Sequence, residues 1–183
     1  GNLIIGGGEK VAIQSMATFK IADVERAILE CNRLQQAGLD IMRFSVTDEQ
    51  DAKAFAMVKK GTNVPLVADI HFDYKLAIAA AEGGASKIRI NPGNIGGEDR
   101  VEAVVKVCKE KNIPIRIGVN GGSLDKKLLE KYGHPTADAL VESAFEHIAL
   151  LEKFDFYDTC VSMKSSTVPT MVEAARLFRS KCD

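Results

Sequence analysis

Four positively charged residues stand in or at the end of short stretches that are otherwise rich in Ile, Val and Phe. They are Arg43, Arg89, Arg116 and Lys164. If these stretches are strands, side chains alternate between two faces, and each cation lies opposite an apolar face. A buried charge needs an anionic partner or a wet cavity, and planar guanidinium groups suit phosphate oxygens. The set therefore predicts a site for a multiply charged anion such as a diphosphate.

Acidic and neutral polar residues share the same face of these stretches. Asp69 is the one acidic member, and it either joins the site or pairs privately with an arginine. His71 is a candidate general acid or base held by Asp69, and an equally good candidate for a structural histidine. The remaining members are hydrogen-bonding groups that we expect to help bind the anion: Gln14, Asn91, Asn120 and Ser162.

The segment 86–97, SKIRINPGNIGG, adds a second sign of anion binding. It reads as a strand that carries Arg89, a Pro-Gly-Asn turn and a Gly-Gly pair, before a helix that opens at Glu98. A glycine-rich loop that leads into a helix N-terminus presents backbone N–H groups and a positive dipole end. Turns also need glycine for backbone reasons, so this loop alone is a weak signal.

The composition describes a globular chain of 183 residues with a formal net charge of −1 and 46% hydrophobic residues. The balanced charge gives no electrostatic reason to expect nucleic acid, and no apolar run approaches the length of a membrane span. Cys31, Cys108, Cys160 and Cys182 are widely separated, which favours a reducing, cytoplasmic setting. We expect Cys31 and Cys108 to be buried thiols on helices, His134 to lie in a loop and His147 on an exposed helix face.

Six strand-then-helix units follow one another along the chain. The expected strands are 11–15, 41–46, 65–70, 87–91, 113–120 and 157–163. Asp23 is expected to cap the first helix, and Thr47 with Gln50 to form a capping box for the second. Strict alternation of strands and helices predicts a parallel sheet with crossover helices.

The polar face of the strands decides between the two parallel architectures. Strands of a doubly wound sheet are apolar on both faces, whereas these carry polar residues on one face, which we expect to gather at the carboxyl ends of the strands. That pattern favours an incomplete TIM-type (β/α) barrel with six of eight units. Strands one and six would then have unpaired outer edges, so residues 1–183 are expected to be the N-terminal part of a (β/α)8 barrel domain.

Longer motifs resemble a known family. They are VPLVADIHFDYKLAIAAAEGG, KIRINPGNIGGEDR, IPIRIGVNGGSLDKKLLEKYG with PTADALVESAFEHI, and SMKSSTVPTMVEA. They are similar to the barrel domain of the 4-hydroxy-3-methylbut-2-enyl diphosphate synthase family, from the methylerythritol phosphate route to isoprenoids. The resemblance runs from Val11 to the C-terminus.

The resemblance implies an iron-sulfur oxidoreductase that reductively opens and dehydrates methylerythritol cyclodiphosphate at a [4Fe-4S] cluster. It also implies a ferredoxin or flavodoxin as electron donor, a homodimer, and a cluster on a separate C-terminal domain. This chain alone is then expected to ligate no cluster and to be inactive. The family's barrel cations carry over onto Arg43, Arg89, Arg116 and Lys164, with Asp69, His71, Asn91 and Asn120 beside them.

The loop after Met16 departs from the family, whose members usually carry a Thr/Asn-rich run there. Residues 17–21 read ATFKI, so no polar substrate contact is transferred to this loop.

Two other functions remain open. One is a Schiff-base aldolase that uses Lys164, which borohydride trapping would detect, and the other is a non-catalytic phosphate-binding module.

Overall fold

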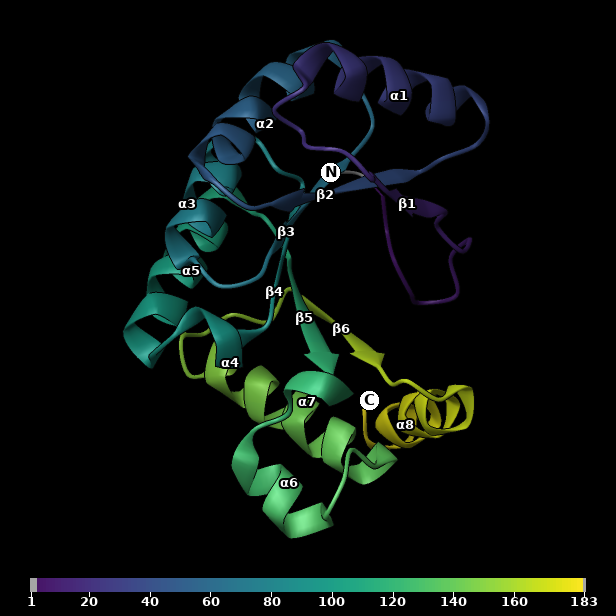
Figure 1. The fold of residues 1–183 in the computed structure, drawn as a ribbon, viewed down its shortest axis with the longest axis vertical. Helices are drawn as coiled ribbons and strands as arrows, with labels where there is room; N and C mark the ends of the chain where they lie inside the picture. The colour runs from purple at the N-terminus through teal and green to yellow at the C-terminus, as the bar shows by residue number, and fades with distance from the viewer. Residues whose placement is uncertain (1–2, 183) are drawn as a thin grey trace.

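The computed structural model describes residues 3–182, which form a curled, parallel half-barrel (Figure 1). The six strands pair in sequence order, each with the next, and all pairs are parallel. The strands are β1 (Gln14–Met16), β2 (Ile41–Val46), β3 (Leu66–Ile70), β4 (Lys87–Ile90), β5 (Ile115–Asn120) and β6 (Thr159–Lys164). The predicted incomplete barrel of six strand-helix units is confirmed.

Helices cover the convex face of the sheet and leave the concave face open (Figure 1). Side chains of Asp23, Asp48, Asp73 and Asp125 accept backbone N–H groups at the starts of four helices, as N-caps do. None of the helices in the described part of the chain is long and apolar enough to cross a membrane. The helices are α1 (Val24–Gln36), α2 (Glu49–Gly61), α3 (Tyr74–Glu82), α4 (Pro92–Ile95), α5 (Glu98–Lys111), α6 (Lys126–Tyr132), α7 (Ala137–Glu152) and α8 (Val168–Lys181), with a 3₁₀ turn, η1, at Gly121–Ser123.

Two local predictions are wrong. The first strand begins at Gln14 and not at 11, because its pairing with β2 starts where Gln14 lies beside Ile41, and Val11 is 84% exposed. The cap of α2 is Asp48, which accepts the N–H of Asp51. Thr47 instead donates its N–H and hydroxyl to the buried Asp51 carboxylate. The N-cap of α2 therefore lies one residue after the predicted Thr47.

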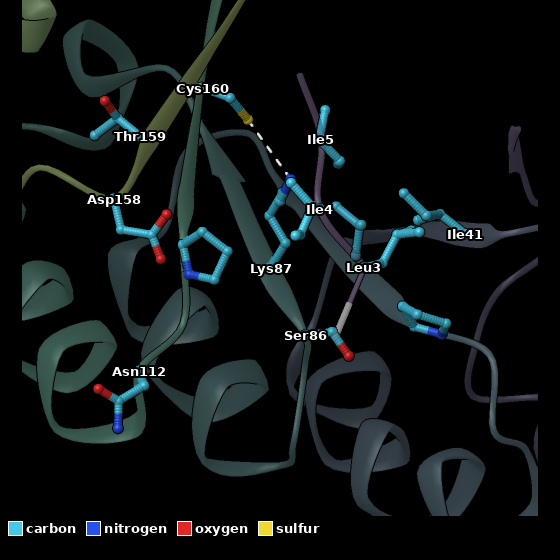
Figure 2. A pocket seen from close by; sticks show the side chains of 13 residues that line it. Leu3, Ile4, Ile5, Ile41, Ser86, Lys87, Asn112, Asp158, Thr159 and Cys160 are labelled. Carbon is cyan, nitrogen blue, oxygen red and sulfur yellow. Dashed lines mark hydrogen bonds between the residues drawn. The ribbon is translucent and has the colours of Figure 1, made fainter. Parts of the chain in front are cut away.

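The N-terminal segment lies across the amino ends of the strands. Leu3, Ile4 and Ile5 line a cavity of about 330 Å³ together with residues from the starts of β2, β4 and β6 (Figure 2). This cavity is the amino-terminal mouth of the half-barrel lumen, and the polar site described below lies further along the strands.

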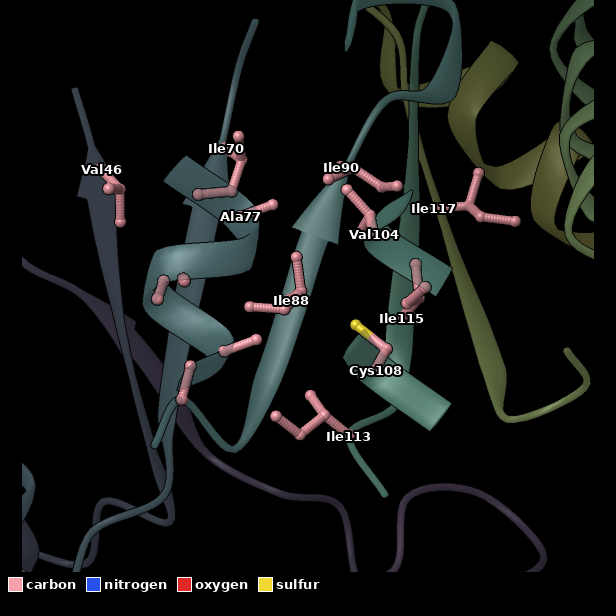
Figure 3. Packing of buried hydrophobic residues seen from close by; sticks show 14 of the residues in the cluster. Val46, Ile70, Ala77, Ile88, Ile90, Val104, Cys108, Ile113, Ile115 and Ile117 are labelled. Carbon is pink, nitrogen blue, oxygen red and sulfur yellow. The ribbon is translucent and has the colours of Figure 1, made fainter. Parts of the chain in front are cut away.

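The hydrophobic core lies between the sheet and its helices. Ile88 and Ile90 of β4 and Ile115 and Ile117 of β5 are fully buried, and they pack with side chains of α3 and α5 such as Ala77 and Val104 (Figure 3). Alternation along each strand sends these residues outward toward the helices. The neighbouring residues in the sequence therefore point into the lumen.

Candidate anion-binding site

Cross-strand register brings one row of lumen residues together. Ser45 pairs with Asp69, Asp69 with Arg89, Arg89 with Arg116, and Arg116 with Cys160. Residues paired in a parallel sheet point to the same face, so this row runs across the concave surface from β2 to β6. Two arginines, one carboxylate and one thiol thus share a level of the lumen.

Asp69 is the central anion of the row and is 3% exposed. Its Oδ1 accepts a hydrogen bond of 2.9 Å from Nη1 of Arg89, and its Oδ2 lies 3.6 Å from Nε of Arg43. Nε2 of His71 lies 3.9 Å from the same Oδ2, at the end of β3 where the histidine is half-exposed. The structure therefore makes the private pairing that the sequence left open, and Asp69 holds two of the three arginines in place.

The row carries more positive than negative charge. Among the described residues, Arg116 forms no ion pair, whereas Arg43 and Arg89 share the single carboxylate of Asp69. Burial lowers the pKa of Arg116, and the positive charges of Arg43 and Arg89 lower it further, against opposing contributions from Cys160 and Asp69. A bound polyanion would remove both penalties, because it supplies the missing negative charge and hydrogen-bond acceptors.

Gly118 makes room for the Arg89 side chain. A Cβ atom at this position would overlap the guanidinium of Arg89, so this position of β5 requires a residue without a side chain. Arg43 is held on its other side, since its Nη2 donates to the sulfur of Met16 at 2.9 Å. Alternation placed Gly118 on the lumen face of β5, but sequence reasoning gave it no role, and it gave none to Met16.

The arginines lie deeper in the lumen than the sequence suggested. Arg43 is the third residue of β2, Arg89 the third of β4 and Arg116 the second of β5. The expectation that the polar residues gather at the carboxyl ends is therefore wrong for these three. It holds for Lys164, which is the exposed last residue of β6, and for His71 and Asn91, which follow β3 and β4.

The two asparagines at the rim close their own loops. Asn91 Oδ1 accepts the N–H of Gly93 at 3.1 Å, and its Nδ2 donates to Ser123 Oγ at 3.4 Å. Asn120 Oδ1 accepts the N–H of Gly122 at 3.2 Å. These bonds join the loops that follow β4 and β5, so the asparagines shape the rim of the site.

The glycine-rich loop differs from its prediction. The segment after Asn91 forms the short helix α4, and the N–H groups of Gly93 and Asn94 bond to Asn91 itself. The next helix, α5, begins with Glu98 and Asp99, whose negative charges occupy its N-terminus. The loop therefore offers an anion less than the sequence suggested, and the arginine row carries the site.

The remaining candidates lie at the margins. Ser162 donates to the carbonyl oxygen of Ile117 at 3.4 Å, and Gln14 begins the edge strand β1 beside Ile41. His134 is exposed in a loop, as expected. His147 is not exposed: it lies against Gly93, and burial lowers its pKa.

The cysteines are dispersed over the fold. Cys31 and Cys108 are buried thiols on α1 and α5, as predicted, and burial raises the pKa of Cys31 to about 11 and that of Cys108 to about 12. In residues 3–182, no cluster of three or more His, Cys, Asp or Glu side chains could hold a metal ion.

The fold and the site define a class: a (β/α)-barrel protein with an arginine-rich lumen suited to a polyanionic ligand. Residues 1–183 match the family described as the GcpE TIM-barrel domain, and the chain belongs to that family.

The curated relatives give the family a chemical context. The chain is 60% identical over 174 residues to the 4-hydroxy-3-methylbut-2-en-1-yl diphosphate synthase (flavodoxin) of Shouchella clausii, a match that covers 95% of this chain and 47% of that protein. It is 58% identical over 181 residues to the protein of the same name from Clostridium perfringens, covering 99% and 52%. The chain spans about half the length of the curated relatives it matches.

Solved structures show the same fold at low sequence identity. A dihydropteroate synthase from Xanthomonas albilineans superposes with a TM-score of 0.53 at 14% identity, over 93% of this chain and 64% of that one. The carboxyl transferase domain of Rhizobium etli pyruvate carboxylase superposes with a TM-score of 0.53 at 11% identity, over 84% and 27%. These likenesses concern the barrel architecture alone.

Proposed function

We propose that the chain is the substrate-binding barrel portion of an enzyme that converts 2-C-methyl-erythritol 2,4-cyclodiphosphate into 4-hydroxy-3-methylbut-2-enyl diphosphate by reductive ring opening and dehydration. The observation that carries this proposal is the excess of positive charge in the lumen, where Arg43 and Arg89 share the carboxylate of Asp69 and Arg116 forms no ion pair among the described residues. The names and high identity of the relatives support the choice of substrate.

The lumen residues divide the work of binding. Arg116, which has no ion-pair partner among the described residues, takes the diphosphate most directly, and Arg89 and Arg43 approach it while Asp69 fixes their positions. Lys164 and His71 lie nearer the open end, where they would contact the outer part of the ligand. Asn91, Asn120, Ser162 and Gln14 complete the proposed set by shaping the surrounding loops and strand ends.

The reductive step would be carried out by a group outside the described residues. A [4Fe-4S] cluster would supply the electrons for ring opening. Two further strand-helix units would complete the barrel, and a separate domain would carry the cluster. In a homodimer, that domain of one subunit would reach the barrel of the other. A flavodoxin or ferredoxin would deliver the electrons. The word flavodoxin in the relatives' names supports the donor. A cytoplasmic location belongs to the same proposal.

The aldolase alternative receives no support from the position of Lys164. A lysine that forms a Schiff base is activated by an apolar pocket or by close cations, whereas Lys164 is exposed at the end of β6. Borohydride trapping with a carbonyl substrate should leave Lys164 unmodified. Trapping at Lys164 would favour the aldolase.

Isothermal titration with the cyclodiphosphate tests the proposal, with inorganic diphosphate and a sugar monophosphate as comparators. The titration is made on this chain and on the full-length polypeptide. We expect the full-length protein to bind the cyclodiphosphate most tightly, with an affinity that falls as salt rises. Equal binding of all three ligands would indicate a general phosphate-binding module, and binding of none would contradict the site.

A further inference from the structure

Near the amino ends of the strands, a lysine below the arginine row contacts the cysteine at the β6 end of that row. Nζ of Lys87, the first residue of β4, donates a hydrogen bond of 3.6 Å to Sγ of Cys160, the second residue of β6 (Figure 2). Both side chains line the cavity of about 330 Å³ at the amino ends of the strands. The pair lies at the opposite end of the lumen from Lys164, and the proposed function gives it no task.

The register explains how two residues on non-adjacent strands reach one another. Strand β5 lies between them, and Ile88 pairs with Ile115, which sets Pro114 beside Lys87. Pro114 lines the same cavity as Lys87 and Cys160, and the long lysine side chain extends across β5 to reach β6. Cys160 pairs with Arg116 and therefore lies one row further along the strands than Lys87.

The sulfur has positive charge on two sides. The ammonium of Lys87 contacts it directly, and Arg116 is its partner in the register of β5 and β6. Reactive cysteines are found in such electropositive, partly exposed surroundings, whereas Cys31 and Cys108 are fully buried. Within residues 3–182, Lys87 forms no ion pair with a carboxylate, so the thiol is its polar neighbour.

We propose that Cys160 and Lys87 form an oxidation site at which hydrogen peroxide produces a covalent sulfenamide link between β4 and β6. In the first step the thiolate sulfur attacks peroxide: an S–O bond forms, the O–O bond breaks, and the leaving hydroxide takes up a proton from the Lys87 ammonium as water, which leaves the amine uncharged. In the second step the uncharged amine of Lys87 attacks the sulfenic sulfur: an S–N bond forms, the S–O bond breaks, and the sulfenic oxygen leaves as water with one amine proton. The sulfur is oxidised by two electrons and one peroxide is reduced.

The experiment is peptide mapping by mass spectrometry after the purified protein is treated with hydrogen peroxide. A link at Lys87 blocks trypsin there, so the expected product joins peptide 76–89 to peptide 154–164 and weighs two hydrogen atoms less than their sum. Dithiothreitol should separate the two peptides. The readout does not depend on diphosphate binding, so this proposal and the proposed function fail separately.

Two variants provide the controls. Lys87→Arg keeps the positive charge but lacks the nucleophilic amine, so the linked product should be lost while Cys160 still becomes sulfenic acid, detected with dimedone. Cys182→Ser removes another partly exposed thiol and should leave the product unchanged. Absence of the linked peptide in the unmodified protein, or a linked peptide that retains an oxygen atom, would overturn the proposal.

Discussion

The two faces of the same strands behave in opposite ways. On the convex face, Ile88, Ile90, Ile115 and Ile117 are fully buried against helices. One residue further along the same strands, Arg89 and Arg116 point into a lumen where a single buried carboxylate, that of Asp69, offsets three arginines. Burial of apolar area on the convex face stabilises the folded protein. Holding like charges close together on the concave face lowers the stability of the unliganded protein.

This difference teaches that stability and ligand binding are carried by alternate residues of one strand. A substitution on the convex face should change the free energy of unfolding with little effect on the lumen. A substitution of Arg116 should do the reverse. The arginine row is preorganised for a polyanion at a cost in the unliganded protein.

The largest effect is expected on the convex face. Ile88→Ala removes a fully buried side chain and should lower the free energy of unfolding by about 4 kcal/mol, because it loses apolar burial and leaves a cavity. Urea denaturation measures this value. Leu29→Ala, at a residue that is 70% exposed on α1, should change it by less than about 0.5 kcal/mol. Similar losses for both variants would contradict the assignment of the core.

Asp69→Asn tests whether the concave face depends on its one carboxylate. The variant leaves Arg89 and Arg43 without an anionic partner, so the free energy of unfolding should fall by about 3 kcal/mol. Added diphosphate should recover part of the loss by supplying negative charge. Thermal and urea denaturation measure these values. Glu49→Gln, which breaks an exposed ion pair with Lys53, should lower the free energy of unfolding by less than about 1 kcal/mol. If Asp69→Asn left the free energy of unfolding unchanged, the arginines would not be held by this residue.

Arg116→Ala should separate binding from stability. In the full-length protein we expect diphosphate binding to weaken by about 2 kcal/mol or more, since a charge-assisted contact is lost. The unliganded protein should be no less stable, because burial and the neighbouring arginines already disfavour this charge. Arg33→Ala, at an exposed arginine paired with Glu30, should leave titration calorimetry unchanged. Unchanged binding in Arg116→Ala would remove Arg116 from the site.

Gly118→Ala probes the same row without changing a charge. The added methyl group overlaps the guanidinium of Arg89, so either the arginine moves or β5 shifts, at a cost of about 1 kcal/mol in unfolding free energy. Diphosphate affinity should fall as well, although by less than in Arg116→Ala. Gly122→Ala is the matched control, because a Cβ there meets its nearest atom, Asn120 Oδ1, at 3.8 Å. Equal effects of the two variants would argue against the tight packing of Arg89 on β5.

The smallest effect at neutral pH comes from the buried thiols. Burial raises the pKa of Cys108 from 9.0 to about 12, so above pH 9 the unfolded chain releases a proton that the folded protein retains. Stability is therefore fully present below pH 9 and falls as pH rises toward 12. Cys108→Ala should show a shallower fall in urea melts between pH 9 and 11, whereas Cys182→Ala should follow the unmodified protein. Identical slopes for all three would contradict the burial of Cys108.

The order of strands and helices was predictable because each unit carries its own local signals. Alternation identified both faces of β2 to β6, and the helix expected to open at Glu98 begins there as α5. The edge strand β1 was placed too early, since its limits depend on where β2 stops pairing with it and not on its own residues.

The amino-acid sequence by itself determined that the arginines face away from the helices, because side-chain alternation is a local property of a strand. Tertiary structure alone decided that Asp69 pairs with Arg89 and Arg43, that Gly118 yields space to Arg89, that His147 is covered by the loop at Gly93, and that Lys87 reaches Cys160. Each of these contacts joins segments distant in the chain. They depend on the register and curvature of the sheet, which are set by the packing of all six units together.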